Sequence, residues 1–157
     1  MSEAPSPTNP EIAGLLEALA DLLEVDEASP FRIRAYRNGA DTIRHHPTAL
    51  AELVRDGEDL TDLQDIGKGL AGTIAEIVEL GVAGFRARMA RDHPIGWLQL
   101  LRLPGLGPKR VRMLAKELGV SDPEELRQAL VEGRLRTVRG FGPKSEEELL
   151  RRLEQLE

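Results

Sequence analysis

The fold is decided by the stretch Leu103-Pro104-Gly105-Leu106-Gly107-Pro108-Lys109, which returns almost unchanged as Val138-Arg139-Gly140-Phe141-Gly142-Pro143-Lys144. A weaker copy, Leu-Gln-Asp-Ile-Gly-Lys-Gly, occupies residues 63–69. The aligned second glycines are Gly67, Gly107 and Gly142, which lie 40 and 35 residues apart. Apolar residues at helical spacing follow each copy. Three related units at this spacing predict an internal repeat rather than three coincidental loops.

A glycine–hydrophobe–glycine turn suits a very short connection between two helices that faces a phosphate. Glycine accepts positive φ, and the missing Cβ lets an anion approach the backbone. The hydrophobe (Ile66, Leu106 or Phe141) is expected to lie between the two helices and to fix their angle. The helix that follows presents free N–H groups and the positive end of its dipole. The turns are therefore candidate phosphate sites that read no base sequence.

Turn and cap signals divide the rest of the chain into short helices. Asn9 and Pro10 read as the cap and first residue of one helix, and Ser29 and Pro30 open another that runs to Arg44. Further helices are predicted from Thr48 to near Gly57 and at about 68–80, 84–92, 95–101, 108–118, 123–132 and 143–156. No stretch alternates apolar and polar residues as a half-buried strand does. The predicted fold class is all-α.

Composition excludes several kinds of site. The 157 residues contain no cysteine, which excludes a disulfide scaffold, a cysteine-ligated metal and a thiol nucleophile. One Trp, one Tyr and three Phe are too few for a platform on which single-stranded bases stack. No apolar run has the roughly 18 residues of a membrane span, and no signal peptide is recognisable, so we expect no membrane partner and a cytoplasmic, nucleoid-associated protein.

Taken alone, the formal net charge of −6 argues against nucleic acid as a partner, but the charge is unevenly spread along the chain. Acids dominate residues 1–30 and 47–65, whereas bases dominate residues 31–46, 97–117 and 134–145. Local clustering of charge, rather than the total, steers a polyanion. The acidic run Glu146 to Glu148 is expected in the first turn of the last helix. There its negative charge interacts favourably with the helix dipole and limits how closely the third hairpin approaches DNA.

The repeated turn resembles the helix-hairpin-helix motif, a DNA-binding unit without sequence specificity. The second and third copies match closely, whereas Asp65 replaces the first glycine of the first copy. The order of parts over residues 10–155 is similar to the non-catalytic N-terminal region of bacterial family X DNA polymerases. Residues 1–9, which are rich in Pro and Ser, are expected to form a flexible tail. The resemblance implies an 8-kDa-like domain at 10–82, a connecting helix at 83–93 and a tandem hairpin domain at 94–157.

The resemblance also implies residue roles at a gap in DNA. The positions that match the family's 5′-phosphate site are Arg32 and Tyr36, with Arg37 and Lys68 as additions. Relatives with 5′-deoxyribose-phosphate lyase activity use a lysine where this chain has Thr73, which has no amine to form an imine. The metal-binding aspartates of the family's palm domain lie downstream of this region, so no polymerase activity and no catalytic residue are expected between residues 1 and 157.

Family hairpins often bind a monovalent cation through backbone carbonyls, which implies Na⁺ or K⁺ as the only cofactor. By position the carbonyl donors are Thr61, Leu63 and Ile66; Leu101, Leu103 and Leu106; and Arg136, Val138 and Phe141.

We therefore expect a non-enzymatic module that grips phosphates at gaps, nicks or 5′-phosphate ends of DNA. The backbone-tracking residues are Gly67, Gly69, Gly105, Gly107, Lys109, Arg110, Gly140, Gly142 and Lys144. A polymerase palm domain is a possible further partner, and the module could equally act alone in repair. Two other functions stay open: a lyase that uses Lys68, and a module that docks proteins.

Overall fold

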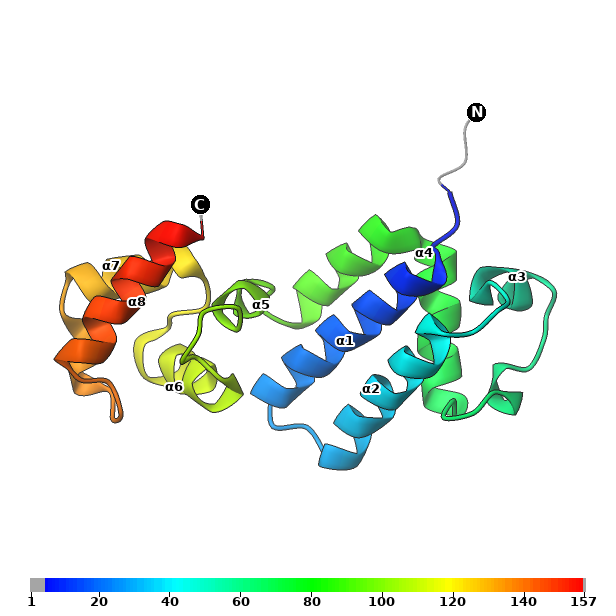
Figure 1. Ribbon diagram of the computed structural model, residues 1–157, viewed down its shortest axis with the longest axis horizontal. Coiled ribbons are helices and arrows are strands. Elements are labelled where there is room, and N and C mark those ends of the chain that lie inside the picture. The colour runs from blue at the N-terminus through cyan, green and yellow to red at the C-terminus, as the bar shows by residue number, and fades with distance from the viewer. Residues whose placement is uncertain (1–4, 157) are drawn as a thin grey trace. The chain divides into compact units, whose positions relative to one another are not determined.

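The computed structural model describes residues 5–156, which form helices joined by turns and contain no strand. This confirms the all-α prediction. The chain divides into two compact units, Met1–Asp92 and His93–Glu157, coloured blue to green and green to red in Figure 1. Of the connecting helix predicted at 83–93, residues 83–92 group with the first unit and His93 with the second. Of the tail predicted at residues 1–9, the first four lie outside the described residues, as does Glu157.

The first unit is built on a pair of helices, α1 (Asn9–Val25) and α2 (Pro30–Arg44), which pack extensively on each other. The chain then passes through α3 (Leu50–Arg55) and a short 3-10 helix, η1 (Leu60–Asp62), into α4 (Lys68–Asp92), which contacts both α1 and α2. The largest fully buried side chains of this unit are Ile12, Leu16, Leu22, Ile43, Leu50, Ile74 and Ile77. Ile12, Leu16 and Leu22 all belong to α1, so this helix supplies much of the core.

The start of α1 differs from the prediction. Thr8 is the N-cap: its hydroxyl accepts a hydrogen bond from the N–H of Glu11, and the Glu11 carboxylate accepts one from the N–H of Thr8. This is a capping box, which satisfies both donors at once. The prediction that Asn9 caps this helix is wrong, because the Asn9 side chain instead accepts from the N–H of Leu50 and donates to the carbonyl of Thr48. Asn9 thus ties α1 to the start of α3.

Helix α4 contains a break at Gly81, where φ is 77° and ψ is 171°. These angles are not helical, and glycine adopts them without the steric cost that a side chain would add. The break lies between the two segments predicted at 68–80 and 84–92. The sequence pattern therefore located both halves of α4.

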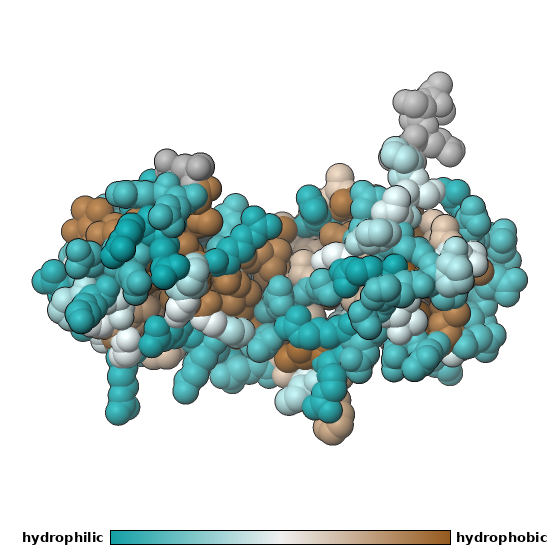
Figure 2. Space-filling model, in the orientation of Figure 1, coloured by the Kyte–Doolittle hydropathy of each residue, from teal (hydrophilic) through white to brown (hydrophobic). Residues whose placement is uncertain are grey.

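The second unit contains α5 (Gly96–Leu100), α6 (Pro108–Leu118), α7 (Pro123–Val131), the 3-10 helix η2 (Arg134–Thr137) and α8 (Pro143–Gln155). Its largest fully buried side chains are Leu100, Leu103, Leu114, Leu126 and Leu135. Hydrophilic side chains cover most of the visible face of both units (Figure 2). Among the described residues, no helix combines the length and the apolar character needed to cross a membrane.

Candidate nucleic-acid interface

The three predicted turns have the same backbone hydrogen bonds. In each turn the central hydrophobe donates its N–H to the carbonyl three residues earlier, over 3.3 Å at Ile66, 3.0 Å at Leu106 and 3.3 Å at Phe141. In each, the carbonyl of the second glycine accepts from the fourth residue after it, over 2.9 Å at Gly67 and 3.0 Å at both Gly107 and Gly142. The weak first copy therefore folds as a hairpin like the other two.

The first glycine of each turn has a left-handed backbone. Its φ is 91° at Gly105 and 94° at Gly140. Asp65 holds the same place in the first hairpin with φ of 65°. Asp and Asn enter this region more readily than other residues with side chains. The first hairpin thus keeps its shape although it has lost this glycine.

The second glycine of each turn is not required by the fold. Gly107 and Gly142 are the N-caps of α6 and α8, and their φ values of −90° and −107° suit any residue. A Cβ built on either of them, or on Gly67, meets no atom within 4 Å. At Gly39, by contrast, a Cβ would overlap the side chain of Leu70. The second glycines therefore leave open space over the backbone at the start of a helix.

The helix starts that face this space carry no side-chain cap. Neither Gly107 nor Gly142 offers a side-chain acceptor, and Pro108 and Pro143 occupy the first turn. Lys109 and Lys144 follow directly and are exposed. An anion is favoured at the starts of α6 and α8, because uncapped N–H groups, the positive end of the helix dipole and a lysine side chain lie together there.

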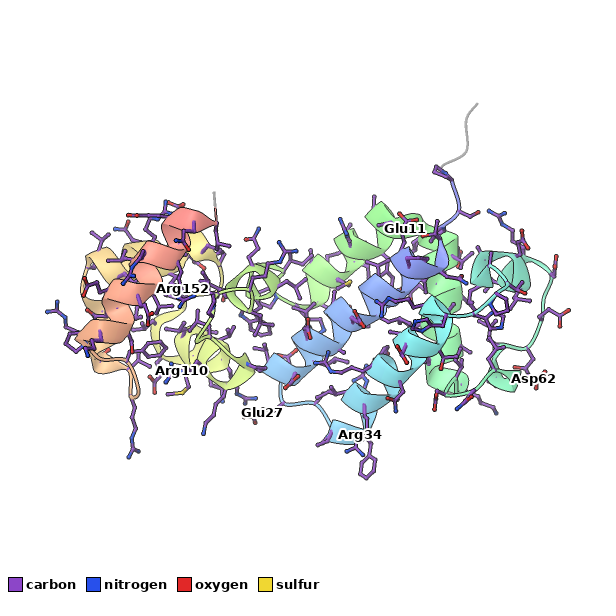
Figure 3. All side chains as sticks on the ribbon, in the orientation of Figure 1. Glu11, Glu27, Arg34, Asp62, Arg110 and Arg152 are labelled. Carbon is purple, nitrogen blue, oxygen red and sulfur yellow. The ribbon has the colours of Figure 1, made fainter. Side chains whose placement is uncertain are left out.

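Arg110 of α6, labelled in Figure 3, contacts both the second and the third hairpin. Its guanidinium donates to the carbonyl of Gly105 over 3.1 Å and lies 5.3 Å from the centre of the Phe141 ring. The two turns line one shallow depression, whose wall includes Pro104, Gly105, Arg110 and Phe141. The central hydrophobes Leu106 and Phe141 are both buried, as predicted.

The first unit brings part of the predicted 5′-phosphate set together. The Tyr36 hydroxyl lies 3.3 Å from the Thr73 hydroxyl, and the Arg32 guanidinium lies 5.9 Å from the centre of the Tyr36 ring. Thr73 in turn donates to the carbonyl of Gly69 over 3.2 Å. Arg32 and Lys68 are exposed, whereas Tyr36 is only 8% exposed. Arg32 and Tyr36 of α2 are therefore linked to the first turns of α4, where Lys68 begins the helix.

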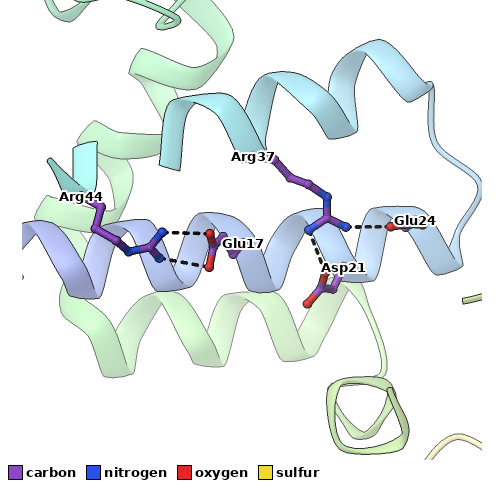
Figure 4. Close-up of polar contacts among 5 residues, drawn as sticks. All are labelled: Glu17, Asp21, Glu24, Arg37 and Arg44. Atoms are coloured by element: carbon purple, nitrogen blue, oxygen red, sulfur yellow. Dashed lines mark hydrogen bonds and ion pairs between the residues drawn. The ribbon is translucent and has the colours of Figure 1, made fainter. Parts of the chain in front are cut away.

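Arg37 does not join this group. Its guanidinium donates to Asp21 over 3.0 Å and to Glu24 over 2.7 Å, both on α1 (Figure 4). Partial burial lowers the pKa of Arg37, but the hydrogen bonds to Asp21 and Glu24 outweigh it and the net shift is upward. Arg44 likewise forms a bidentate ion pair with Glu17, in which each Nη nitrogen lies 3.0 Å from one carboxylate oxygen. Both arginines join α2 to the acidic face of α1.

The first hairpin is the acidic one. The Asp65 carboxylate accepts a hydrogen bond from Thr42 of α2 over 3.2 Å. Just upstream, Asp59 caps η1, and hydrogen bonds from the hydroxyl and N–H of Thr61 lower the pKa of its carboxyl. Asp62, on η1, is also exposed (Figure 3). No three of these acids, nor any other His, Asp or Glu side chains among the described residues, gather as a metal site.

The carbonyls predicted to hold a monovalent cation fit that role in one respect. The carbonyls of Leu63, Leu103 and Val138 each accept one hydrogen bond within their turn. A carbonyl oxygen has two lone pairs, so each keeps one for a cation. The three hairpins therefore share an equivalent carbonyl with one lone pair that the turn hydrogen bond does not use.

The sequence pattern missed one buried acid. Glu146, expected with Glu147 and Glu148 in the first turn of α8 as an acid that limits the approach of DNA, is only 8% exposed. Its register is the signal that could have found it, because it occupies the place that Val111 holds after the second hairpin. Val111 is fully buried.

Comparison with known proteins agrees with this geometry. A family model described as "Helix-hairpin-helix domain" matches residues 7–83, and one described as "SAM-like Helix-hairpin-helix tandem" matches residues 98–155. The chain is 36% identical over 143 residues to "DNA polymerase/3'-5' exonuclease PolX" of Bacillus subtilis (strain 168). That match spans 91% of this chain but only 24% of the relative. The chain is therefore a helix-hairpin-helix protein whose sequence resembles part of a bacterial family X DNA polymerase.

Proposed function

We propose that this chain binds DNA without sequence specificity, by contacts to the phosphate backbone at gaps, nicks or ends. The observation that carries the proposal is the second glycine of each hairpin. Neither backbone conformation nor packing requires glycine at Gly107 or Gly142, yet both precede uncapped helix starts. A phosphate oxygen that hydrogen-bonds to the backbone requires that bare surface. The similarity to a DNA polymerase supports nucleic acid as the partner.

The two units would divide the task. In the second unit, Gly105, Gly107, Lys109, Arg110, Gly140, Gly142 and Lys144 would track the duplex backbone, with Arg110 holding the two hairpins at a fixed spacing. In the first unit, Arg32, Tyr36 and Lys68 would hold a 5′-phosphate, with Gly67 and Gly69 at the start of α4. Arg37 is left out, because two carboxylates already occupy its guanidinium.

The net charge of −6 is compatible with DNA binding, because many acids lie away from the proposed phosphate sites. Three acids of α1 are paired with Arg37 and Arg44. The exposed bases Lys109 and Lys144, by contrast, lie at helix starts. An acidic protein with such local clusters would bind DNA with modest affinity that falls as salt rises.

A bound Na⁺ or K⁺ would supply positive charge between the turn carbonyls and a phosphate. The donors would be the carbonyls of the three sets named above, such as Leu103 and Leu106 in the second hairpin. In a longer polymerase, a catalytic palm domain would be the natural partner of this DNA-binding region.

The test is binding to a gapped duplex with and without a 5′-phosphate, over a salt series. About five phosphate contacts predict a slope of log affinity against log salt of roughly −4 to −5. The 5′-phosphate should increase the affinity, and Arg32→Ala should remove that increase while leaving binding to intact duplex unchanged. A salt-independent signal, or no binding to any duplex, would refute the proposal.

No observation among the described residues favours a lyase. Thr73, at the position of the lyase nucleophile, is hydrogen-bonded to Tyr36 and to the carbonyl of Gly69. Protein docking through the hairpins makes a different prediction: Lys109→Glu and Lys144→Glu would then leave partner binding intact, and there would be no affinity for DNA to lose.

A further inference from the structure

The third hairpin contains a buried carboxylate that the other two lack. Glu146 is the fourth residue after the second glycine, a place held by Ala71 and Val111 in the other hairpins. It is 8% exposed, and its Oε1 has no hydrogen-bond partner among the described residues. Burying an acceptor in this way costs free energy, whereas a valine at the same place costs none. An acid that persists here against that cost points to a role other than packing.

The other carboxylate oxygen of Glu146 faces Arg136 of η2. Nε of Arg136 lies 3.4 Å from Oε2 of Glu146. The two side chains differ sharply in environment, because that of Arg136 is 75% exposed and that of Glu146 is 11% exposed. The guanidinium also passes close to Gly133, where an added Cβ would lie 3.8 Å from its Cζ. Arg136 is therefore anchored at its inner edge and open at its outer edge.

This contact through Nε leaves the two Nη groups of the Arg136 guanidinium available for a ligand. Nε is directed toward Glu146, and neither Nη nitrogen has a hydrogen-bond partner within residues 5–156. Two Nη groups side by side match two oxygens of a phosphate, and a fixed orientation lowers the entropy that such a contact loses. Arg136 also stands two residues before Val138, where the third hairpin begins, and exposed Arg139 and Lys144 belong to that hairpin.

We propose that Arg136 is a phosphate-binding residue of the third hairpin and that buried Glu146 is the positioning residue that orients its guanidinium. This inference rests on the proposed DNA-binding function and adds a side-chain contact to the backbone contacts of that hairpin. The sequence pattern places Arg136 in the basic run at 134–145 and assigns its carbonyl to a cation, but it does not assign its side chain a contact of its own.

The decisive variant is Glu146→Val, which installs the residue that the second hairpin already has. A buried carboxylate oxygen without a hydrogen-bond partner costs free energy that valine does not, so the melting temperature should be unchanged or higher. Affinity for duplex DNA should fall about five- to tenfold, because Arg136 loses its orientation. General electrostatics predicts the opposite sign, since removing an acid strengthens binding to a polyanion. The sign of the change therefore separates the two explanations.

Three further variants complete the test. Arg136→Ala should weaken binding about tenfold and reduce the salt slope by about 0.9, the value of one phosphate contact. Arg134→Ala is its matched control, because Arg134 lies on the same 3-10 helix but pairs with the exposed Glu132 over 3.0 Å. Its effect should be at most twofold. Glu147→Val is the control for Glu146: this neighbour is exposed, so affinity should stay the same or rise.

The outcomes separate this inference from the proposed function. If the unaltered protein shows no salt-dependent binding to DNA, the proposed function fails. If it binds, but Glu146→Val lowers the melting temperature and leaves affinity unchanged, Glu146 is merely structural and the inference fails alone. Equal effects of Arg136→Ala and Arg134→Ala would likewise overturn the assigned contact.

Discussion

Replacement of Gly107 or Gly142 by alanine should weaken DNA binding while leaving the stability of the fold almost unchanged. At Gly107 and Gly142 the backbone is extended and a Cβ meets no atom within 4 Å. Alanine reduces the entropy of the unfolded chain, which stabilises, but it is a poorer N-cap than glycine, which destabilises. The two effects oppose each other, so each substitution should change the free energy of unfolding by less than about 1 kcal/mol.

The effect on binding should be much larger. A Cβ at either position occupies the space through which a phosphate would reach the uncapped N–H groups. Loss of one hydrogen bond to a charged group costs about 1.5–3 kcal/mol, which is a tenfold to 150-fold weaker affinity. The double variant should bind more weakly than either single variant, with a deviation from the sum of the two free energies that measures the coupling through Arg110.

The assay is fluorescence anisotropy with a labelled duplex, paired with thermal unfolding of each variant. Gly14→Ala is the control, because Gly14 is an exposed glycine inside α1 with no atom near its Cβ position. It should raise stability slightly and leave binding unchanged. Gly105→Ala should lower stability, since φ there is 91°. If the Gly107 and Gly142 variants fold normally and bind as tightly as the unaltered protein, backbone contact with phosphate is refuted.

Four more outcomes follow from the hairpins and their supports. Asp65→Asn keeps a residue that tolerates positive φ and can still bond Thr42, but it removes a negative charge, so DNA affinity should rise about two- to fivefold when measured by anisotropy. Phe141→Ala should destabilise the second unit by about 3–5 kcal/mol in thermal or urea unfolding, because the ring is buried; a smaller loss than 1 kcal/mol would contradict its role between the helices. Arg37→Met should leave the preference for a 5′-phosphate unchanged in the gapped-duplex assay, and a lost preference would return Arg37 to that site. Borohydride reduction on an incised abasic duplex should trap no adduct, and an adduct that disappears in Lys68→Ala would instead establish the lyase.

Local signals predicted most of the fold. Proline after Ser29 located the start of α2, and the repeated turn located the starts of α6 and α8 together with the apolar residues that follow them. The same logic misassigned the cap of α1, although Thr8 and Glu11 already had capping-box spacing. Asn9 could not have been placed from sequence, because its partners lie about 40 residues away.

The site was harder to predict wherever it depends on contacts between helices. The hairpin glycines could be found because their chemistry is local. The occupation of Arg37 by Asp21 and Glu24 depends on how α2 packs on α1, which no local pattern encodes. The two acidic neighbours of Glu146 obscured its burial, although the repeat register aligns Glu146 with the buried Val111 of the second hairpin.

The left-handed backbone of Asp65 has a consequence for how such repeats are counted. A search for paired glycines finds two copies in this chain, whereas the hydrogen-bond pattern finds three. The turn keeps its backbone conformation although Asp65 stands where the other copies have glycine. Degenerate repeats are therefore better identified from torsion angles and donor–acceptor registers than from a consensus sequence, because a consensus with two glycines misses the first hairpin of this chain.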